Sequence, residues 1–253
     1  MRPPARSVAT TIAAIGLAAV ALGCASTFQY RAVQSNFMEA AHLDNLATVD
    51  PLSESTAEAS YASIVTELTP EKIAGLDPKL RGNAWVIRGY SQWRSGQYAG
   101  AVTSAESGLA TDALGPRDRV LLTLLPALAV DSEVKVAWAA KLPSLTEADY
   151  APLGKDFATA YRQVTKARGL YDQSTAPSTK YYVAYQEWRL VNDWQIVIGT
   201  LDRESEVSAA RAGARAAAET ILGGKFAVVL DAARESIPKG HPLREMIAAQ
   251  SGA

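Results

Sequence analysis

Apolar residues recur every three to five positions along most of the chain, and this spacing limits the possible fold more than any other sequence feature. It places apolar side chains on one face of a helix. The first such segment runs over 28–47, where the recurring residues are Phe28, Val33, Phe37, Ala40, Ala41 and Leu46. No alternation of apolar and polar residues is long enough to indicate a β-strand. The sequence therefore predicts an all-α fold.

Proline and capping residues mark where further helices begin. Thr69 and Asp77 each precede a proline, which is typical of an N-cap followed by proline at the first helical position. The leucine-rich segment 117–130 predicts a buried central helix that Pro126 bends or splits. Residues 173–178 indicate a loop. The other predicted helices cover 56–68, 146–170, 181–200 and 202–222.

The segment 83–109 carries the most specific internal motif. Large, small and turn-forming residues stand in it at set positions: Trp85, Gly89, Gly96, Tyr98, Ala101, Ala105, Gly108 and Leu109. Small residues at 89 and 101 allow two antiparallel helices to cross closely, and Gly96 suits a left-handed turn between them. This spacing resembles the tetratricopeptide repeat, a unit of two paired helices. Arg88 and Gln92 depart from the pattern, which has Leu and often an aromatic residue there.

The resemblance implies antiparallel helical hairpins stacked as a TPR-like α-solenoid. Repeat proteins need about three such units to bury a continuous core, so degenerate helical pairs are expected to complete the stack. The segment 213–238, with Gly224 and Phe226 near its turn, is a candidate degenerate repeat. An ordinary helical hairpin explains it as well, because Gly-x-aromatic is a short and common string.

Aromatic residues are the strongest candidates for binding. In the repeat family, ligand contacts come from set positions of the inner helix, and these correspond here to Asn83, Val86, Tyr90, Trp93 and Arg94. Tyrosine, tryptophan and arginine dominate interface energetics. A second aromatic group consists of Tyr181, Tyr182, Tyr185 and Trp188. The alternative is that Trp93 and Trp188 simply pack between helices.

Cys24, the only cysteine, follows a segment with the features of a secretory signal. Arg2 and Arg6 precede an uncharged apolar run that leads to Ala21-Leu22-Gly23 before the cysteine. This order resembles the lipobox of bacterial lipoproteins. The resemblance implies that residues 1–23 are a signal peptide and that the Cys24 thiol is acylated.

Other processing of this segment stays open. Ala21 stands where the lipobox usually has Leu, and ordinary signal peptidase could instead use the small residues at 23–25 and release a soluble protein. An uncleaved span is a third alternative, but 8–23 is shorter than the roughly 20 apolar residues that cross a bilayer. Ala25, rather than Asp, follows the cysteine. In a host with two membranes, this residue favours the outer membrane, facing the periplasm.

The mature chain, 24–253, is long enough for a single helical domain. With one cysteine it has no internal disulfide, so its core alone must stabilise the fold. Removing Arg2 and Arg6 from the 25 basic residues leaves 23 against 26 acidic ones, a net charge of −3. This balance gives no electrostatic reason to expect nucleic acid or anionic lipid as a partner. The expected membrane contact is the lipid anchor at Cys24, because two or more acyl chains hold a protein durably.

Few residues point to catalysis. His42 and His241 are far apart in sequence, and the only thiol is the expected lipidation site, so no metal-ligand set is predicted. No nucleophile elbow, phosphate-binding loop or dinucleotide fingerprint occurs in the sequence. We therefore expect no catalytic residues, no metal and no cofactor.

Two classes of function remain open at this point. The first is a non-enzymatic scaffold or adaptor lipoprotein of the cell envelope, which docks a protein or peptide partner on its helical repeats. The second is a periplasmic small-molecule-binding lipoprotein associated with a solute transporter, with an aromatic pocket closed by helices. A specific protein partner would favour the first class, and a co-purifying metabolite the second.

Overall fold

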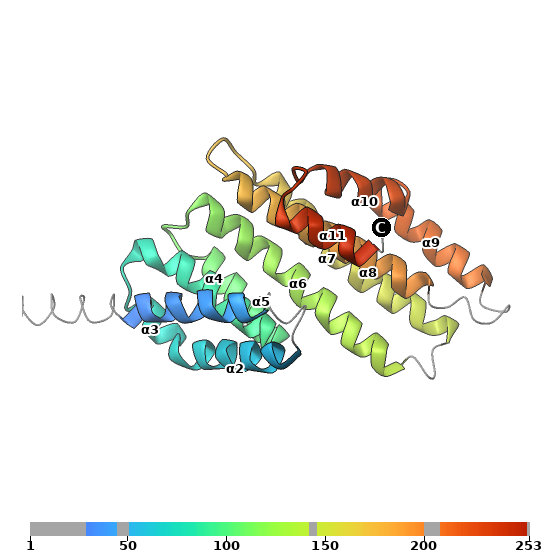
Figure 1. The fold of residues 1–253 in the computed structure, drawn as a ribbon. Coiled ribbons are helices and arrows are strands. Elements are labelled where there is room, and N and C mark those ends of the chain that lie inside the picture. The colour runs from blue at the N-terminus through green and yellow to red at the C-terminus, as the bar shows by residue number, and fades with distance from the viewer. Residues whose placement is uncertain (1–28, 45–50, 142–145, 200–207, 252–253) are drawn as a thin grey trace, which may run out of the picture.

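The computed structural model describes residues 29–44, 51–141, 146–199 and 208–251. The first described helix covers 29–44 (blue in Figure 1). The elements that follow are α2 (Pro51–Glu67), α3 (Pro70–Ala74), α4 (Pro78–Arg94), α5 (Tyr98–Leu109), α6 (Pro116–Lys141), the 3₁₀ turn η2 (Glu147–Asp149), α7 (Tyr150–Gly169), α8 (Pro177–Gly199), α9 (Ser208–Leu222), α10 (Phe226–Glu235) and α11 (Pro242–Ser251). The described part of the chain contains no strand, which confirms the all-α prediction.

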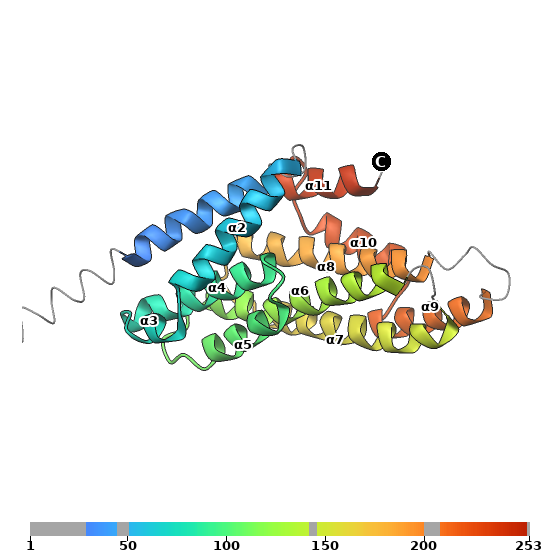
Figure 2. The ribbon, with the colours of Figure 1, turned by 90° about the horizontal axis from the view of Figure 1, so that it is seen from below.

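The helices lie side by side in an elongated stack (Figures 1 and 2). The long α6 runs through the middle and packs against α4 and α5 as well as α7 and α8. The largest apolar cluster extends from α4 to α10, and a second one joins helix 29–44 to α2, α3 and α4. Phe37 and Trp85 contact both clusters, so the two are continuous.

The two predicted N-caps are confirmed. Thr69 Oγ1 accepts a hydrogen bond from the Lys72 amide at 3.4 Å, and Asp77 Oδ1 accepts one from the Lys79 amide at 2.9 Å. Each therefore satisfies a donor at the start of α3 or α4. The preceding helix, α2, begins at Pro51, earlier than the predicted start at residue 56. Proline is well suited to a first helical position, because its missing N–H has no partner there in any case.

The leucine-rich segment forms α6, as predicted, and it is not split at Pro126. The buried leucines of this helix are Leu121, Leu122, Leu124, Leu125 and Leu128. An interior proline costs a helix about 3 kcal/mol, whereas burying one leucine side chain contributes about 1.5–3 kcal/mol. Core packing therefore outweighs the lost backbone hydrogen bond, and one continuous helix results.

α4 and α5 form the helical hairpin that the motif predicts. Gly96 joins them with φ of 75°, in the left-handed region that glycine favours. At the crossing, a Cβ atom on Gly89 would overlap Leu125 Cδ2 and lie 3.4 Å from Ser104 Cβ. Ala101 faces the same crossing and is fully buried. The close approach of the two helices therefore depends on these small residues.

The two departures from the repeat pattern both make hydrogen bonds. The Arg88 guanidinium donates to the carbonyl oxygens of Val65 and Leu68, at 2.7 Å each, and so satisfies carbonyls at the end of α2. Gln92 is buried, and its Oε1 accepts a hydrogen bond from Ser104 Oγ on α5 at 2.6 Å. Polar side chains at these positions therefore link α4 to its two neighbours.

The second candidate repeat, 213–238, also contains two helices and a turn. α9 and α10 are joined through Gly223, which has φ of 71°. However, α10 packs chiefly against α8, whereas α9 packs chiefly against α7. The two helices are therefore less closely paired than α4 and α5.

Candidate functional site

The structure places the five predicted partner-binding residues of α4 against other helices. Val86, Tyr90 and Trp93 are buried, with 5, 7 and 6 % of their surface exposed. Asn83 and Arg94 are half-buried. In this fold the three buried side chains pack between helices and do not line an open groove. The position of Trp93 agrees with the alternative interpretation, in which it packs between helices. Partner binding at these five residues stays a prediction.

Asn83 and Arg94 both contact helix 29–44. Asn83 Oδ1 accepts hydrogen bonds from Tyr30 Oη at 2.7 Å and from Gln34 Nε2 at 3.1 Å. Arg94 forms an ion pair and hydrogen bond with Asp44 near the end of the same helix. Helix 29–44 therefore contacts two of the five α4 residues that the repeat resemblance assigned to a partner.

Trp93 lies at the centre of a cluster of polar and aromatic side chains. Its Nε1 donates a hydrogen bond to Ser132 Oγ on α6 at 2.8 Å. Its ring meets Tyr90 edge-on, with ring centroids 5.8 Å apart. The guanidinium carbons of Arg94 and Arg189 lie 5.2 and 5.6 Å from the ring centroid, within cation–π distance. These contacts fix Trp93 between α4, α6 and α8.

Ion pairs next to Trp93 link α6 to α8. Arg189 lies 3.2 Å from Asp131, and Lys135 lies 2.8 Å from Asp193. Burial raises the pKa of the Asp131 carboxyl above its ordinary value, and the Arg189 guanidinium opposes this effect. Burial also raises the pKa of the Tyr90 phenol well above its ordinary value. The cluster holds three helices together through charge and hydrogen bonds.

The second aromatic group divides between two faces of α8. Tyr181, Tyr185 and Trp188 share one face and pack in an apolar cluster with α11 and the end of α10. Tyr182 points to the other side, where its ring centroid lies 6.2 Å from that of Tyr90. The face that Tyr181, Tyr185 and Trp188 share is therefore a packing face.

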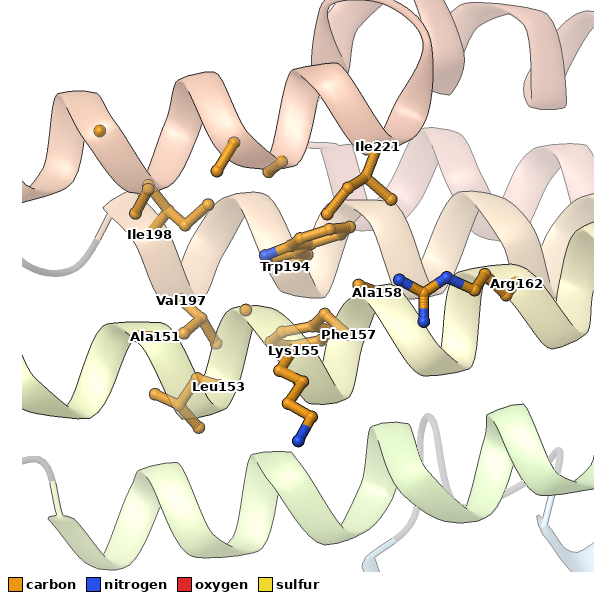
Figure 3. Close-up of a pocket in the computed structure, with 15 residues that line it drawn as sticks. Ala151, Leu153, Lys155, Phe157, Ala158, Arg162, Trp194, Val197, Ile198 and Ile221 are labelled. Atoms are coloured by element: carbon orange, nitrogen blue, oxygen red, sulfur yellow. The ribbon is translucent and has the colours of Figure 1, made fainter.

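An open groove lies instead between α7, α8 and α9 (Figure 3). It has a volume of about 490 Å³ and is lined by residues within 151–162, 194–198 and 213–221. Figure 3 shows α7 and α9 along its two sides, with side chains of α8 between them. Small-molecule sites commonly have volumes of about 300–1,000 Å³ and mostly apolar walls. The groove has both properties.

Two stacked aromatic rings, those of Phe157 and Trp194, lie at the base of the groove. Phe157 of α7 lies parallel to Trp194 of α8, with ring centroids 5.5 Å apart and an interplanar angle of 11°. Phe226 of α10 meets Trp194 edge-on at 6.0 Å. The exposed fractions of Phe157, Trp194 and Phe226 are 0, 2 and 1 %. Phe157 and Trp194 therefore pack tightly at the base of the groove and expose little of their own surface, and Phe226 supports Trp194 from below.

Small residues on the walls keep the groove open. Gly213, Ala214 and Ala217 of α9 line it, and none has a side chain long enough to fill the space above the rings. A Cβ atom added at Gly154 or Gly213 would meet no atom within 4 Å. The volume is therefore a consequence of the alanine-rich composition of α9 and of a glycine on α7.

The charges at the rim are both positive. Among the described residues that line the groove, only Lys155 and Arg162 are charged. Neither forms an ion pair with a carboxylate in the described part of the chain. Ile221, 39 % exposed, adds an apolar side chain to the rim. The groove therefore offers an apolar floor with cationic edges.

Sequence reasoning did not find this site. The one signal in the sequence is the alanine-rich composition of the predicted helix 202–222, because small side chains let neighbouring helices approach closely. The structure shows that small residues on α9 also leave space over Trp194. That outcome depends on the distance between α9 and α8, which no local pattern encodes.

Comparison of the chain with models of protein families, with curated proteins and with solved structures finds no match. Among the described residues, no three His, Cys, Asp or Glu side chains are grouped so as to hold a metal ion. No helix in the same ranges has the length and hydropathy of a membrane span. Cys24 and the predicted signal peptide, 1–23, lie outside the described residues.

Proposed function

We propose that this chain is a non-enzymatic binding lipoprotein of the bacterial cell envelope, whose ligand is a small apolar molecule. The observation that supports this function is the groove between α7, α8 and α9. Phe157 and Trp194 stack at its apolar base, and small residues of α9 line its wall. The groove fits the second class of function, in which helices close an aromatic pocket.

The proposed location follows from the sequence around Cys24. Acyl chains on this cysteine would hold the helical domain at the membrane, facing the periplasm, with the outer membrane favoured by Ala25. The domain then needs no membrane-binding surface of its own, in keeping with its slightly negative charge. A solute transporter is the natural recipient of a small ligand in this compartment.

The anchor is tested by intact-mass spectrometry of the protein purified from membranes. We expect the native chain to begin at Cys24 and to carry the mass of two or three acyl chains. The variant Cys24→Ser should carry none, because serine lacks the thiol that is acylated. A native protein of unmodified mass would contradict the lipoprotein assignment.

A protein or peptide partner is the second candidate function, and the hairpin of α4 and α5 favours it. The close crossing at Gly89 and the glycine turn at Gly96 support this candidate, because the tetratricopeptide pattern has small residues at both positions. We propose on this ground that the stack is a degenerate TPR-like α-solenoid acting as a scaffold or adaptor. A pull-down through the anchored protein tests this candidate. A stoichiometric envelope protein would support it, and no stoichiometric protein in the pull-down would count against it.

The groove itself is tested with an uncharged fluorescent probe, N-phenyl-1-naphthylamine. We expect saturable binding to the full-length chain carrying Cys24→Ser, in which no attached acyl chains compete. Ala217→Phe should weaken binding at least tenfold, because Ala217 lines the groove and the phenyl ring would occupy it. Ala217 is itself exposed, so this variant should keep its melting temperature.

Ala216→Phe is the matched control. Ala216 is also exposed on α9 but does not line the groove. It should therefore bind the probe like the parent chain. Equal affinities in all three proteins would place the probe elsewhere and remove the support for this function.

A further inference from the structure

The groove has two different ends. In Figure 3, Arg162 and Ile221 stand at one end, and Ala151, Leu153 and Ile198 stand at the other. The residues of α7 that line it extend from 151 to 162, which corresponds to about 16 Å at 1.5 Å per residue. One end is therefore cationic and the other apolar. The distance between the two ends is long enough for an extended hydrocarbon chain.

The width of the groove restricts what can enter it. α7 and α9, which form its two sides, also pack directly against each other. Helices in contact have their axes about 8–10 Å apart, which leaves no room for a further helix between them. The occupant must therefore be thin, as a single hydrocarbon chain is.

The positive charge at the rim of the groove indicates the chemistry of the polar end of the ligand. Arg162 lies at the rim without a carboxylate partner in the described part of the chain, and its side chain extends back along α7 toward Ala158 in Figure 3. Lys155 adds a second positive charge, although its amine points away from α9. A guanidinium binds a carboxylate through charge-assisted hydrogen bonds. An anion at Arg162 would thus complement the site.

We propose, on the basis of the function above, that the ligand is a free long-chain fatty acid. Its carboxylate is held by Arg162, its chain lies over Phe157 and Trp194, and its tail reaches the apolar end at Leu153 and Ile198. The shape, the aromatic floor and the unpartnered cation support this one class of ligand together.

Calorimetric titration with dodecanoate and with dodecanol tests the assignment, at concentrations below micelle formation. The protein is the full-length chain with Cys24→Ser. We expect dodecanoate to bind about tenfold more tightly than dodecanol, because only the acid pairs with Arg162. Octanoate should bind more weakly than dodecanoate, by about fourfold for each methylene removed.

Two arginine variants locate the head group. Arg162→Gln should remove the preference for the acid and leave dodecanol binding unchanged. Arg119→Gln, on an exposed position of α6 outside the groove, should behave like the parent chain. Both variants change one surface charge, so a difference between them reports on the site.

Three results would overturn the proposal. The first is that dodecanoate fails to bind while N-phenyl-1-naphthylamine binds and Ala217→Phe removes that binding; the groove would then take another apolar ligand. Arg162→Gln could affect acid and alcohol equally, which would exclude a head group there. Tighter binding of a lauroyl lysophosphatidylglycerol than of dodecanoate would assign the groove to a membrane lipid. Absence of probe binding would instead contradict the proposed function itself.

Discussion

Truncating Trp93 to alanine is expected to lower the free energy of unfolding by about 3–5 kcal/mol, the usual cost of removing a buried tryptophan. The side chain is 6 % exposed, packs edge-on against Tyr90 and donates a hydrogen bond to Ser132 Oγ. The variant also leaves the half-buried Ser132 hydroxyl without its donor. Urea denaturation followed by circular dichroism measures the change.

Trp138→Ala is the matched control for this prediction. Trp138 lies on α6 and is only half-buried, so its loss should cost clearly less. A loss of under about 1 kcal/mol for Trp93→Ala would place this ring at the surface. It would then restore the face of α4 as a candidate binding site.

Replacing Gly89 by leucine is expected to lower the free energy of unfolding by about 3 kcal/mol, at the upper end of the range for overpacked cores. Even a Cβ atom at this position would overlap Leu125 Cδ2, and Ser104 and the Ala101 carbonyl oxygen lie within 3.6 Å. The added side chain must therefore push α5 or α6 away from α4. Thermal melting followed by circular dichroism detects the change.

Gly154→Leu provides the comparison, because a Cβ atom there meets nothing within 4 Å. Leucine also favours a helix more than glycine does, so this variant should be as stable as the parent chain or more so. If Gly89→Leu melted at the same temperature as the parent chain, the result would contradict the close crossing of α4 and α5 at Gly89.

The sequence predicted the helices because their signals are local. The caps at Thr69 and Asp77 depend on residues within a single turn, and the turn at Gly96 depends on one backbone conformation. The buried central helix followed from the number of leucines in α6. In each case, the residues that determine the structure are neighbours in sequence.

The exposed and buried faces of those helices could not be predicted in the same way. Trp93 fits a groove position of a repeat, yet it is buried because α6 and α8 pack over it. Arg88 departs from the repeat pattern, and its role becomes clear only from its hydrogen bonds to the carbonyl oxygens of Val65 and Leu68. Such assignments depend on which helices meet.

The groove is the clearest example of a feature that the sequence alone could not predict. Its base joins Phe157 of α7 to Trp194 of α8, and Phe226 of α10 packs against Trp194. From the sequence alone, each of these residues would be interpreted as an ordinary aromatic residue of the core. The groove above Trp194 arises only from the position of α9.

Photo-crosslinking with an uncharged apolar diazirine tests the central claim, ligand binding between α7, α8 and α9, most directly. The full-length chain carrying Cys24→Ser is labelled, digested and mapped by mass spectrometry, with Ala217→Phe as the blocked control. We predict label on the segments 151–162, 194–198 and 213–221, and its loss in the blocked variant. Label confined to α4 and α5, or unchanged in Ala217→Phe, would contradict the account.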